Sequence, residues 1–319
     1  MRKEEKRKHQ DIVHCLSRIP VTSLLHSELL RGLAIWTIAS CLLLPVILGA
    51  EKPAIPAREL VRRTVENELR AGNDSRSYMF RARKETSDGS QTRVYVQTRE
   101  ATAGMLIALN DKPLTLEQKQ AEESRLRYLL QNPDELRRKQ RQEKDDADRI
   151  SRIVRALPDA FVYEYDGTEA ASSELGKPGE ERLRLKFRPN PKYDPPSRVE
   201  QVLTGMAGYL LIDRSRERIA KIDGTLFKDV SFGWGFFGHL DRGGQFQVEQ
   251  SEVAENGWEI TRMKLSFTGR ILLFKNISIK KTETYSHFQT VPANLTFAQG
   301  VELLEKQQAD EDHRQNGGR

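Results

Sequence analysis

Residues 245–279 read QFQVEQSEVAENGWEITRMKLSFTGRILLFKNISI, and this stretch decides the fold. Its apolar side chains recur at every second position over two segments: Phe246 and Val248 in the first, and Met263, Leu265 and Phe267 in the second. A period of two places successive side chains on opposite faces of a strand. One buried face and one wetter face indicate antiparallel pairing.

Two turn signals divide this stretch into strands. Asn256 and Gly257 give the strongest hairpin signal in the chain, because both residue types tolerate a positive φ angle. Thr268 and Gly269 predict a second turn, followed by a strand over residues 271–279. The stretch therefore predicts three consecutive antiparallel strands.

The same period extends outward on both sides. Further strands are predicted over residues 78–83, 93–98, 104–109, 161–165, 183–187, 209–212, 219–226 and 230–237. Residues 188–198 contain four prolines, which predict a loop, and a short helix is expected around residues 199–203.

Helical patterns precede and interrupt these strands. Residues 57–70 place apolar side chains on one face of an amphipathic helix. Residues 117–155 contain eleven basic and nine acidic residues, and we interpret them as two helices broken at Asn132 and Pro133. This density of charge predicts a solvated second helix, and Pro158 is expected to end it.

These elements predict an α+β fold: a curved, mostly antiparallel β-sheet (a half-barrel) with a helical insertion and packing helices. Residues 1–50 are expected to be a basic leader with a signal peptide or membrane anchor. Residues 51–290 are expected to form a single half-barrel-like domain with a charged helical insert at 115–157. Residues 291–319 are expected to form a C-terminal helix and a polar tail.

The N-terminal region predicts export. Residues 32–50 are 19 residues without a charge, long enough to cross a bilayer, and the basic leader before them predicts an N-terminus inside the cell. Pro45 and the ending at residues 48–50 favour a cleaved signal peptide, while an uncleaved anchor in contact with the membrane stays open. Residues 38–41 resemble a lipobox, although the apolar run continues past Cys41. The expected location is the periplasm or an outer-membrane face.

Charge and cysteine content exclude some classes. The net charge is +6, and residues 1–31 carry seven Lys and Arg against four Asp and Glu. The remaining residues are thus nearly balanced, which argues against a nucleic-acid partner. The two cysteines, Cys15 and Cys41, leave no disulfide or thiolate metal site downstream.

One face of the predicted sheet is rich in aromatic and aliphatic side chains. Residues 233–238, GWGFFG, match the dinucleotide-binding pattern, but they continue a strand and no strand–helix–strand unit surrounds them, so we expect no cofactor. Core packing is the simpler interpretation of this face, and a wall that lines a ligand is the alternative. The candidate ligand-lining residues are Phe232, Trp234, Phe236, Phe246, Val248, Leu265 and Phe267.

No group of residues indicates catalysis or metal binding. His239, His287 and His313 share no metal-ligand spacing. No G-x-S-x-G sequence occurs, and the acidic residues at predicted strand ends are typical of turns: Asp213, Asp223, Asp229 and Asp241. We therefore expect no enzyme activity, no catalytic residue and no metal.

The order of elements resembles that of the LolA/LolB-like half-barrels of the bacterial envelope and of a group of uncharacterised exported proteins. The stretches that carry the resemblance are 110–114, 156–161 and 232–235. The resemblance implies a concave face that holds lipid or acyl chains beneath a helical lid. It implies no individual site residue, and the charged insert departs from that family.

Three functions are compatible with this sequence. The first is a non-enzymatic envelope protein that binds a lipid or another apolar ligand in the concave face. The second is a structural or interaction module of the envelope that docks a protein partner through the charged insert. The third is an exported hydrolase, which would need a histidine–serine or carboxylate pair in a cleft.

Overall fold

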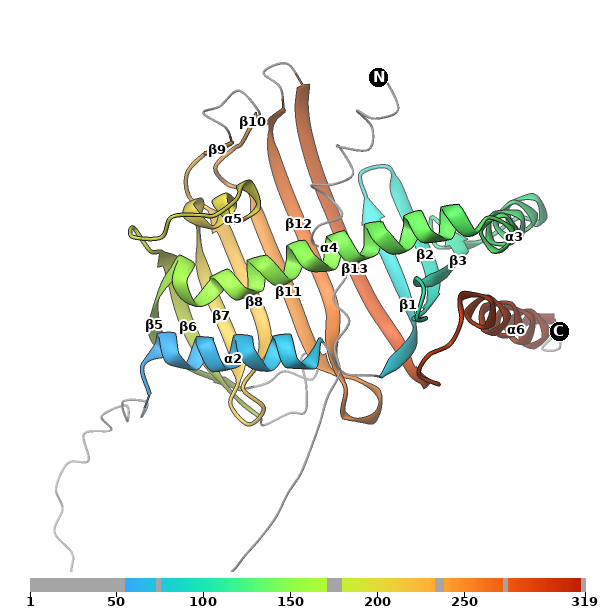
Figure 1. Ribbon diagram of the computed structural model, residues 1–319, viewed down its shortest axis with the longest axis horizontal. Helices are drawn as coiled ribbons and strands as arrows, with labels where there is room; N and C mark the ends of the chain where they lie inside the picture. The colour runs from blue at the N-terminus through green and yellow to red at the C-terminus, as the bar shows by residue number, and fades with distance from the viewer. Residues whose placement is uncertain (1–54, 73–75, 171–179, 233–237, 272–274, 317–319) are drawn as a thin grey trace, which may run out of the picture.

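The computed structural model describes residues 55–72, 76–170, 180–232, 238–271 and 275–316. Within these residues one sheet of 13 strands runs in the order β4-β3-β2-β1-β13-β12-β11-β8-β7-β6-β5, with β10 paired to β12 and β9 to β10. Every pairing is antiparallel. The sheet is curved and stays open between its edges β4 and β5 (Figure 1). The predicted α+β fold class is confirmed.

The strands before the helical insertion are β1 (Ser77–Thr86), β2 (Gly89–Val96), β3 (Ala103–Leu109) and β4 (Lys112–Pro113). Those after it are β5 (Phe161–Ala170), β6 (Glu181–Pro189), β7 (Met206–Asp213), β8 (Arg218–Leu226), β9 (Val230–Phe232), β10 (Gly238–Leu240), β11 (Gln245–Glu252), β12 (Trp258–Ile271) and β13 (Lys275–Val291). The first and last strands pair directly, with Ala82 opposite Tyr285, and this pairing joins the two groups into one sheet.

The described helices are α2 (Ala57–Ala71), α3 (Leu116–Gln131), α4 (Pro133–Ala160), α5 (Arg198–Gln201) and α6 (Phe297–Asn316), with short 3₁₀ turns at η1 (Val202–Gly205) and η2 (Ala254–Asn256). Helix α4 crosses the face of the sheet from β5 to β2, and α2 lies beside it (Figure 1). The break between α3 and α4 falls at Asn132 and Pro133, as predicted.

Helices cover both faces of the sheet, at different places. On β2, Arg93 and Tyr95 line a cavity that also contacts α4. Val94 and Val96 alternate with them and lie in a core cluster with Phe297 of α6. Because alternate side chains of a strand point to opposite faces, α6 lies on the face opposite to α4.

The protein has two main cores. The larger one lies between α2, α4 and strands β5–β8 and β11–β13, and includes Leu60, Leu157 and Leu265. The smaller one lies under α6 and α3, and includes Val96 and Leu126. The larger core therefore lies on the concave side of the sheet, where the sequence placed a candidate ligand wall.

The prediction that Pro158 ends the helix is wrong, because α4 continues to Ala160. Two side chains stabilise the carbonyl groups of this last turn, which have no partner within the helix. Arg58 Nε donates a hydrogen bond to the Pro158 carbonyl over 3.0 Å. The Tyr163 hydroxyl donates to the Leu157 carbonyl over 2.8 Å.

One of the two predicted turns is confirmed and the other is wrong. Residues Asn256 and Gly257 do lie between β11 and β12, although only Asn256 has a positive φ, of 59°. Strand β12 runs straight through Thr268 and Gly269 to Ile271. Gly269 is needed there for a different reason, because a Cβ atom would overlap the carbonyl oxygen of His239 on the paired strand β10.

Candidate functional site

Two adjoining cavities lie between the concave face of the sheet and helix α4. The first, called the apolar cavity, has a volume of about 330 Å³ and is lined mainly by aliphatic and aromatic side chains. The second, called the polar cavity, has a volume of about 850 Å³. Ala147 of α4 and Ile260 of β12 line both cavities, so the two adjoin under the middle of the helix.

Helix α4 forms the roof of the apolar cavity because of the spacing of its apolar residues. Ile150, Ile153, Val154 and Leu157 recur at three- and four-residue intervals and all line the cavity. Ile150 and Leu157 are buried, whereas Arg152 between them is exposed and does not line the cavity, and Arg155 is exposed at its margin. The solvation predicted for this helix therefore holds for one face only.

The strands form the floor of the apolar cavity with side chains at alternate positions. Phe246, Val248 and Gln250 of β11 line it together with Phe267 of β12. Gln250 is the polar exception: it is 4% exposed, and its Oε1 accepts no hydrogen bond from any residue that the structure describes. A buried amide oxygen without a donor is unfavourable, so this position needs an explanation.

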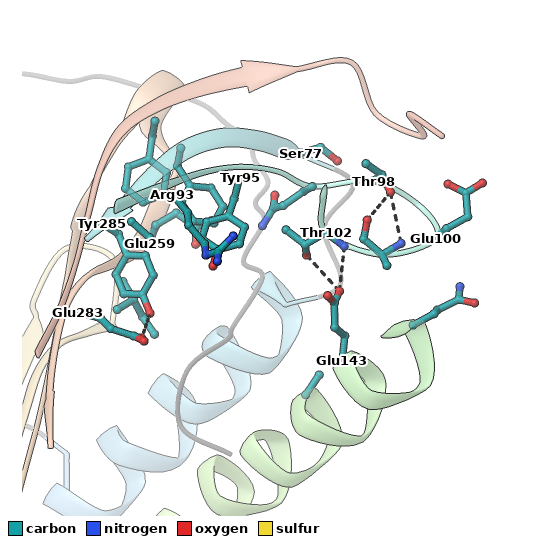
Figure 2. Close-up of a pocket in the computed structure, with 18 of the residues that line it drawn as sticks. Ser77, Arg93, Tyr95, Thr98, Glu100, Thr102, Glu143, Glu259, Glu283 and Tyr285 are labelled. Atoms are coloured by element: carbon teal, nitrogen blue, oxygen red, sulfur yellow. Dashed lines mark hydrogen bonds between the residues drawn. The ribbon is translucent and has the colours of Figure 1, made fainter. Parts of the chain in front are cut away.

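Aromatic rings form much of the wall of the polar cavity. Phe80 stacks on Tyr95 at a centroid distance of 5.5 Å and on Phe288 at 5.4 Å. Tyr285 lies beside them, 6.1 Å from Phe80. Figure 2 shows Tyr95 of β2 and Tyr285 of β13, the strands on either side of β1, with the charged residues Arg93, Glu259 and Glu283 near them.

A buried ion pair lies on the floor of the polar cavity. Lys281 Nζ is 3.1 Å from Glu283 Oε1, and the Tyr285 hydroxyl donates to Glu283 Oε2 over 2.5 Å. Lys281 is 4% exposed. Burial lowers the pKa of Lys281, and the charge of Lys84 lowers that pKa further. The charge and hydrogen bond of Glu283 raise it, but the pKa of Lys281 stays below its usual value.

The N-terminal half of α4 is fastened over the polar cavity by one carboxylate. Glu143 Oε2 accepts hydrogen bonds from the backbone N–H of Thr102 over 2.9 Å and from its hydroxyl over 3.2 Å (Figure 2). Lys139 lies 2.6 Å from the other oxygen of Glu143. These bonds join α4 to the loop between β2 and β3 and hold the roof in place.

The predicted ligand-lining residues separate into three groups. Phe246, Val248 and Phe267 line the apolar cavity. Leu265 is buried in the core, and Phe232 is partly buried against that core. Trp234 and Phe236 lie outside the described residues.

Sequence reasoning missed the polar cavity. A signal for it exists in β13, where Lys281 and Glu283 continue the inward register of Ile277 and Ile279. Charged residues at positions that the period of two assigns to a buried face are rare unless they are paired or functional. The roof residues of α4 recur at helical spacing in the sequence, but that spacing does not say which surface they cover.

The acidic residues at strand ends act in turns or local pairs. Asp213 Oδ1 accepts from the backbone N–H groups of Ser215 and Arg216, and Asp229 accepts from that of Arg242. His239 lies 3.2 Å from Asp241 at the surface. Among the described residues, no group of three or more histidine, cysteine or acidic side chains is placed to hold a metal ion.

No helix in the described part of the chain is both long enough and apolar enough to cross a membrane. The predicted export segment, residues 32–50, lies outside that part. Whether residues 32–50 are a cleaved signal peptide or a membrane anchor therefore stays a prediction.

Comparisons with known proteins add little to these observations. No protein-family model matches the sequence, and no curated protein matches it. None of the comparisons supports the resemblance to the LolA/LolB-like proteins. A structural neighbour is a DUF1329 family protein from Desulfovibrio piger, which is 10% identical, with 77% of this chain and 97% of that chain covered and a TM-score of 0.26; a likeness this weak bears on neither fold nor function.

Proposed function

We propose that this protein binds an elongated apolar or amphiphilic molecule, such as a lipid, in the cavities between its curved sheet and α4. The observation that carries the proposal is the apolar cavity, whose volume of about 330 Å³ is within the usual range for ligand sites. Burial of hydrocarbon there would contribute about 25 cal/mol per Å². The proposed location is the periplasm or the outer-membrane face, as the N-terminal region predicts.

The arrangement of the roof supports this proposal. In an ordinary core, side chains fill the space between a helix and a sheet. Here α4 spans two adjoining cavities, and Glu143 attaches its N-terminal half to the loop between β2 and β3. Binding of this kind needs no catalytic residue. It also accounts for a long amphipathic helix that exposes its charged face and turns its apolar face to the sheet.

Filling the apolar cavity tests the proposal. Val154→Phe places a larger side chain into the cavity from α4, whereas Val162→Phe adds the same group to β5 at a position that does not line it. We expect Val154→Phe to abolish most binding of a neutral fluorescent probe, N-phenyl-1-naphthylamine, while Val162→Phe leaves it unchanged. Equal binding by both variants and the parent would contradict the proposal.

The alternative, a partner-docking module of the envelope, is supported by one observation on α3. Leu116, Tyr128 and Leu130 are exposed by 73%, 51% and 40%. These side chains are the apolar groups of α3 that a partner could cover. Replacing Tyr128 and Leu130 by serine would remove partner binding on this alternative and leave probe binding intact.

A further inference from the structure

The lining of the polar cavity specifies the chemistry of the ligand's head, provided that the proposed function is correct. Its charged side chains are seven cationic ones, Arg76, Lys84, Arg93, Arg99, Arg141, Lys144 and Lys281, and four anionic ones, Glu100, Glu143, Glu259 and Glu283. The apolar cavity next to it has few charged groups. The concave face therefore changes from apolar to cationic along α4.

Most of these cations have carboxylate partners, and the exceptions are informative. Arg93 pairs with Glu122, Arg99 with Glu100, and Lys144 with Asp148. By contrast, Lys84 and Arg141 form no ion pair with any residue that the structure describes. They belong to β1 and α4, so cationic side chains without an ion-pair partner reach the cavity from both its floor and its roof, although Glu283 lies opposite Lys84 on the paired strand.

The deepest cation also lacks full compensation. Lys281 is buried, and it shares the cavity with Lys84, whose charge acts against it. Its ion-pair partner among the described residues, Glu283, also accepts a hydrogen bond from the Tyr285 hydroxyl. A second anion near these two lysines would lower the cost of keeping both of them charged.

We infer that the ligand is an amphiphile whose anionic head, a carboxylate or a phosphate, lies in the polar cavity near Lys84, Lys281 and Arg141. Its hydrocarbon tail passes Ala147 and Ile260 into the apolar cavity. The aromatic wall of Phe80, Tyr95 and Phe288 contacts the part of the molecule next to the head. The inference rests on the proposed function and names its ligand class.

Three ligands with the same tail test this inference: tetradecanoate, tetradecyl phosphate and tetradecanol. Each is titrated against the full chain, purified and freed of lipid, with N-phenyl-1-naphthylamine as the displaced probe. We expect both anions to bind at least about tenfold more tightly than the alcohol, because charge-assisted hydrogen bonds add to the same tail contacts. The tighter of the two anions identifies the head, and added salt should reduce the difference.

Two charge-removing substitutions locate the head. Lys84→Gln and Arg141→Gln together should reduce the preference for the anions severalfold and leave tetradecanol unaffected. Neither side chain is buried, so the variant is expected to fold. The control is Lys264→Gln, an exposed lysine of β12 that lies between Met263 and Leu265 and faces away from the cavities.

Different results would overturn the anionic head and the proposed function. Equal affinity for alcohol and anions, or a full preference retained by the double variant, would overturn the anionic head and leave the proposed function standing. Failure of all three ligands to displace the probe, together with failure of the probe itself to bind, would overturn the proposed function.

Discussion

Glu68 of α2 and Arg218 of β8 form a buried two-point ion pair. Arg218 Nε and Nη2 each donate to a different oxygen of Glu68 over 2.9 Å, and the side chains are 11% and 8% exposed. The backbone N–H of Ile219 donates to the same carboxylate over 2.8 Å. This pair ties α2 to the sheet at the border of the apolar cavity, which Glu68 also lines.

We therefore expect Glu68→Ala to destabilise the protein strongly. Removing one partner leaves the Arg218 guanidinium buried without a counter-charge, which costs about 3–5 kcal/mol. Urea unfolding followed by circular dichroism measures the change. Glu59→Ala is the control, because Glu59 pairs with Arg62 at an exposed site, and such pairs are worth about 0–1 kcal/mol. Similar losses in the two variants would contradict this account of α2.

A second prediction concerns pH and Glu122 of α3. Burial raises the pKa of Glu122, but hydrogen bonds from Arg125 and the Leu106 N–H, with the charges of Arg125 and Arg93, outweigh it and hold the pKa below 4.5. Because the folded-state pKa is lower than the unfolded one, the stabilisation is complete above about pH 4.5 and is lost as pH falls through the folded-state pKa.

Glu122→Gln removes this titration. We expect the variant to be less stable than the parent at neutral pH, and the difference in unfolding free energy to shrink as pH falls below 4.5. Urea unfolding at several pH values between neutral and acid measures it. Glu123→Gln, on the exposed neighbouring position, is the control and should show no such trend. A difference in unfolding free energy that stays constant with pH would show that the carboxylate charge of Glu122 does not contribute to stability.

A third prediction concerns the attachment of α4. Glu143→Ala removes the bonds to the Thr102 N–H and hydroxyl, so the roof of the polar cavity opens more easily. We expect a bound probe to dissociate severalfold faster, measured by stopped-flow fluorescence, and amides near Thr102 to exchange hydrogen faster. Glu135→Ala is the matched control, because among the described residues Glu135 pairs with the nearby Arg138 on the same helix and with no other element. An unchanged dissociation rate would mean that ligands enter elsewhere.

Much of the sheet was predictable because its signal is local. The period of two in β11–β13 predicts strands and their buried faces from adjacent residues alone. Pairing of β1 with β13 joins residues about two hundred positions apart, and no local pattern encodes it. The roles of Gly269 and Pro158 were mispredicted for the same reason. Gly269 lies against the backbone of His239, and the Pro158 carbonyl accepts a hydrogen bond from Arg58. Both contacts are tertiary, so the local sequence does not encode them.

The candidate site was predictable only in part. Phe246, Val248 and Phe267 were found because they belong to a strand pattern, and all three line the apolar cavity. The polar cavity depends on how α4 crosses β12, β13, β1 and β2, which sequence spacing does not specify. Its residues come mainly from four strands, the loop between β2 and β3, and α4, so they line one space only in the folded protein.

The last prediction concerns Gln250, the one polar side chain of β11 in the apolar cavity. Its Oε1 is buried and accepts no hydrogen bond from the described residues, so the folded protein carries the desolvation cost of that oxygen. Gln250→Leu keeps the approximate volume and removes this cost. We therefore expect the ligand-free protein to become about 1 kcal/mol more stable in urea unfolding.

Gln247→Leu is the matched control on the same strand. Gln247 faces the opposite side of the sheet, where its Nε2 donates to Asp223 over 3.1 Å. The same substitution there removes a hydrogen bond and relieves no desolvation cost. The two variants should therefore change stability in opposite directions. A loss of stability in Gln250→Leu would mean that the amide of Gln250 is satisfied in the free protein, for example by a water molecule bound in the cavity. That outcome would make the apolar cavity wetter than its aliphatic lining indicates, and it would reduce the expected gain from burying a hydrocarbon tail there.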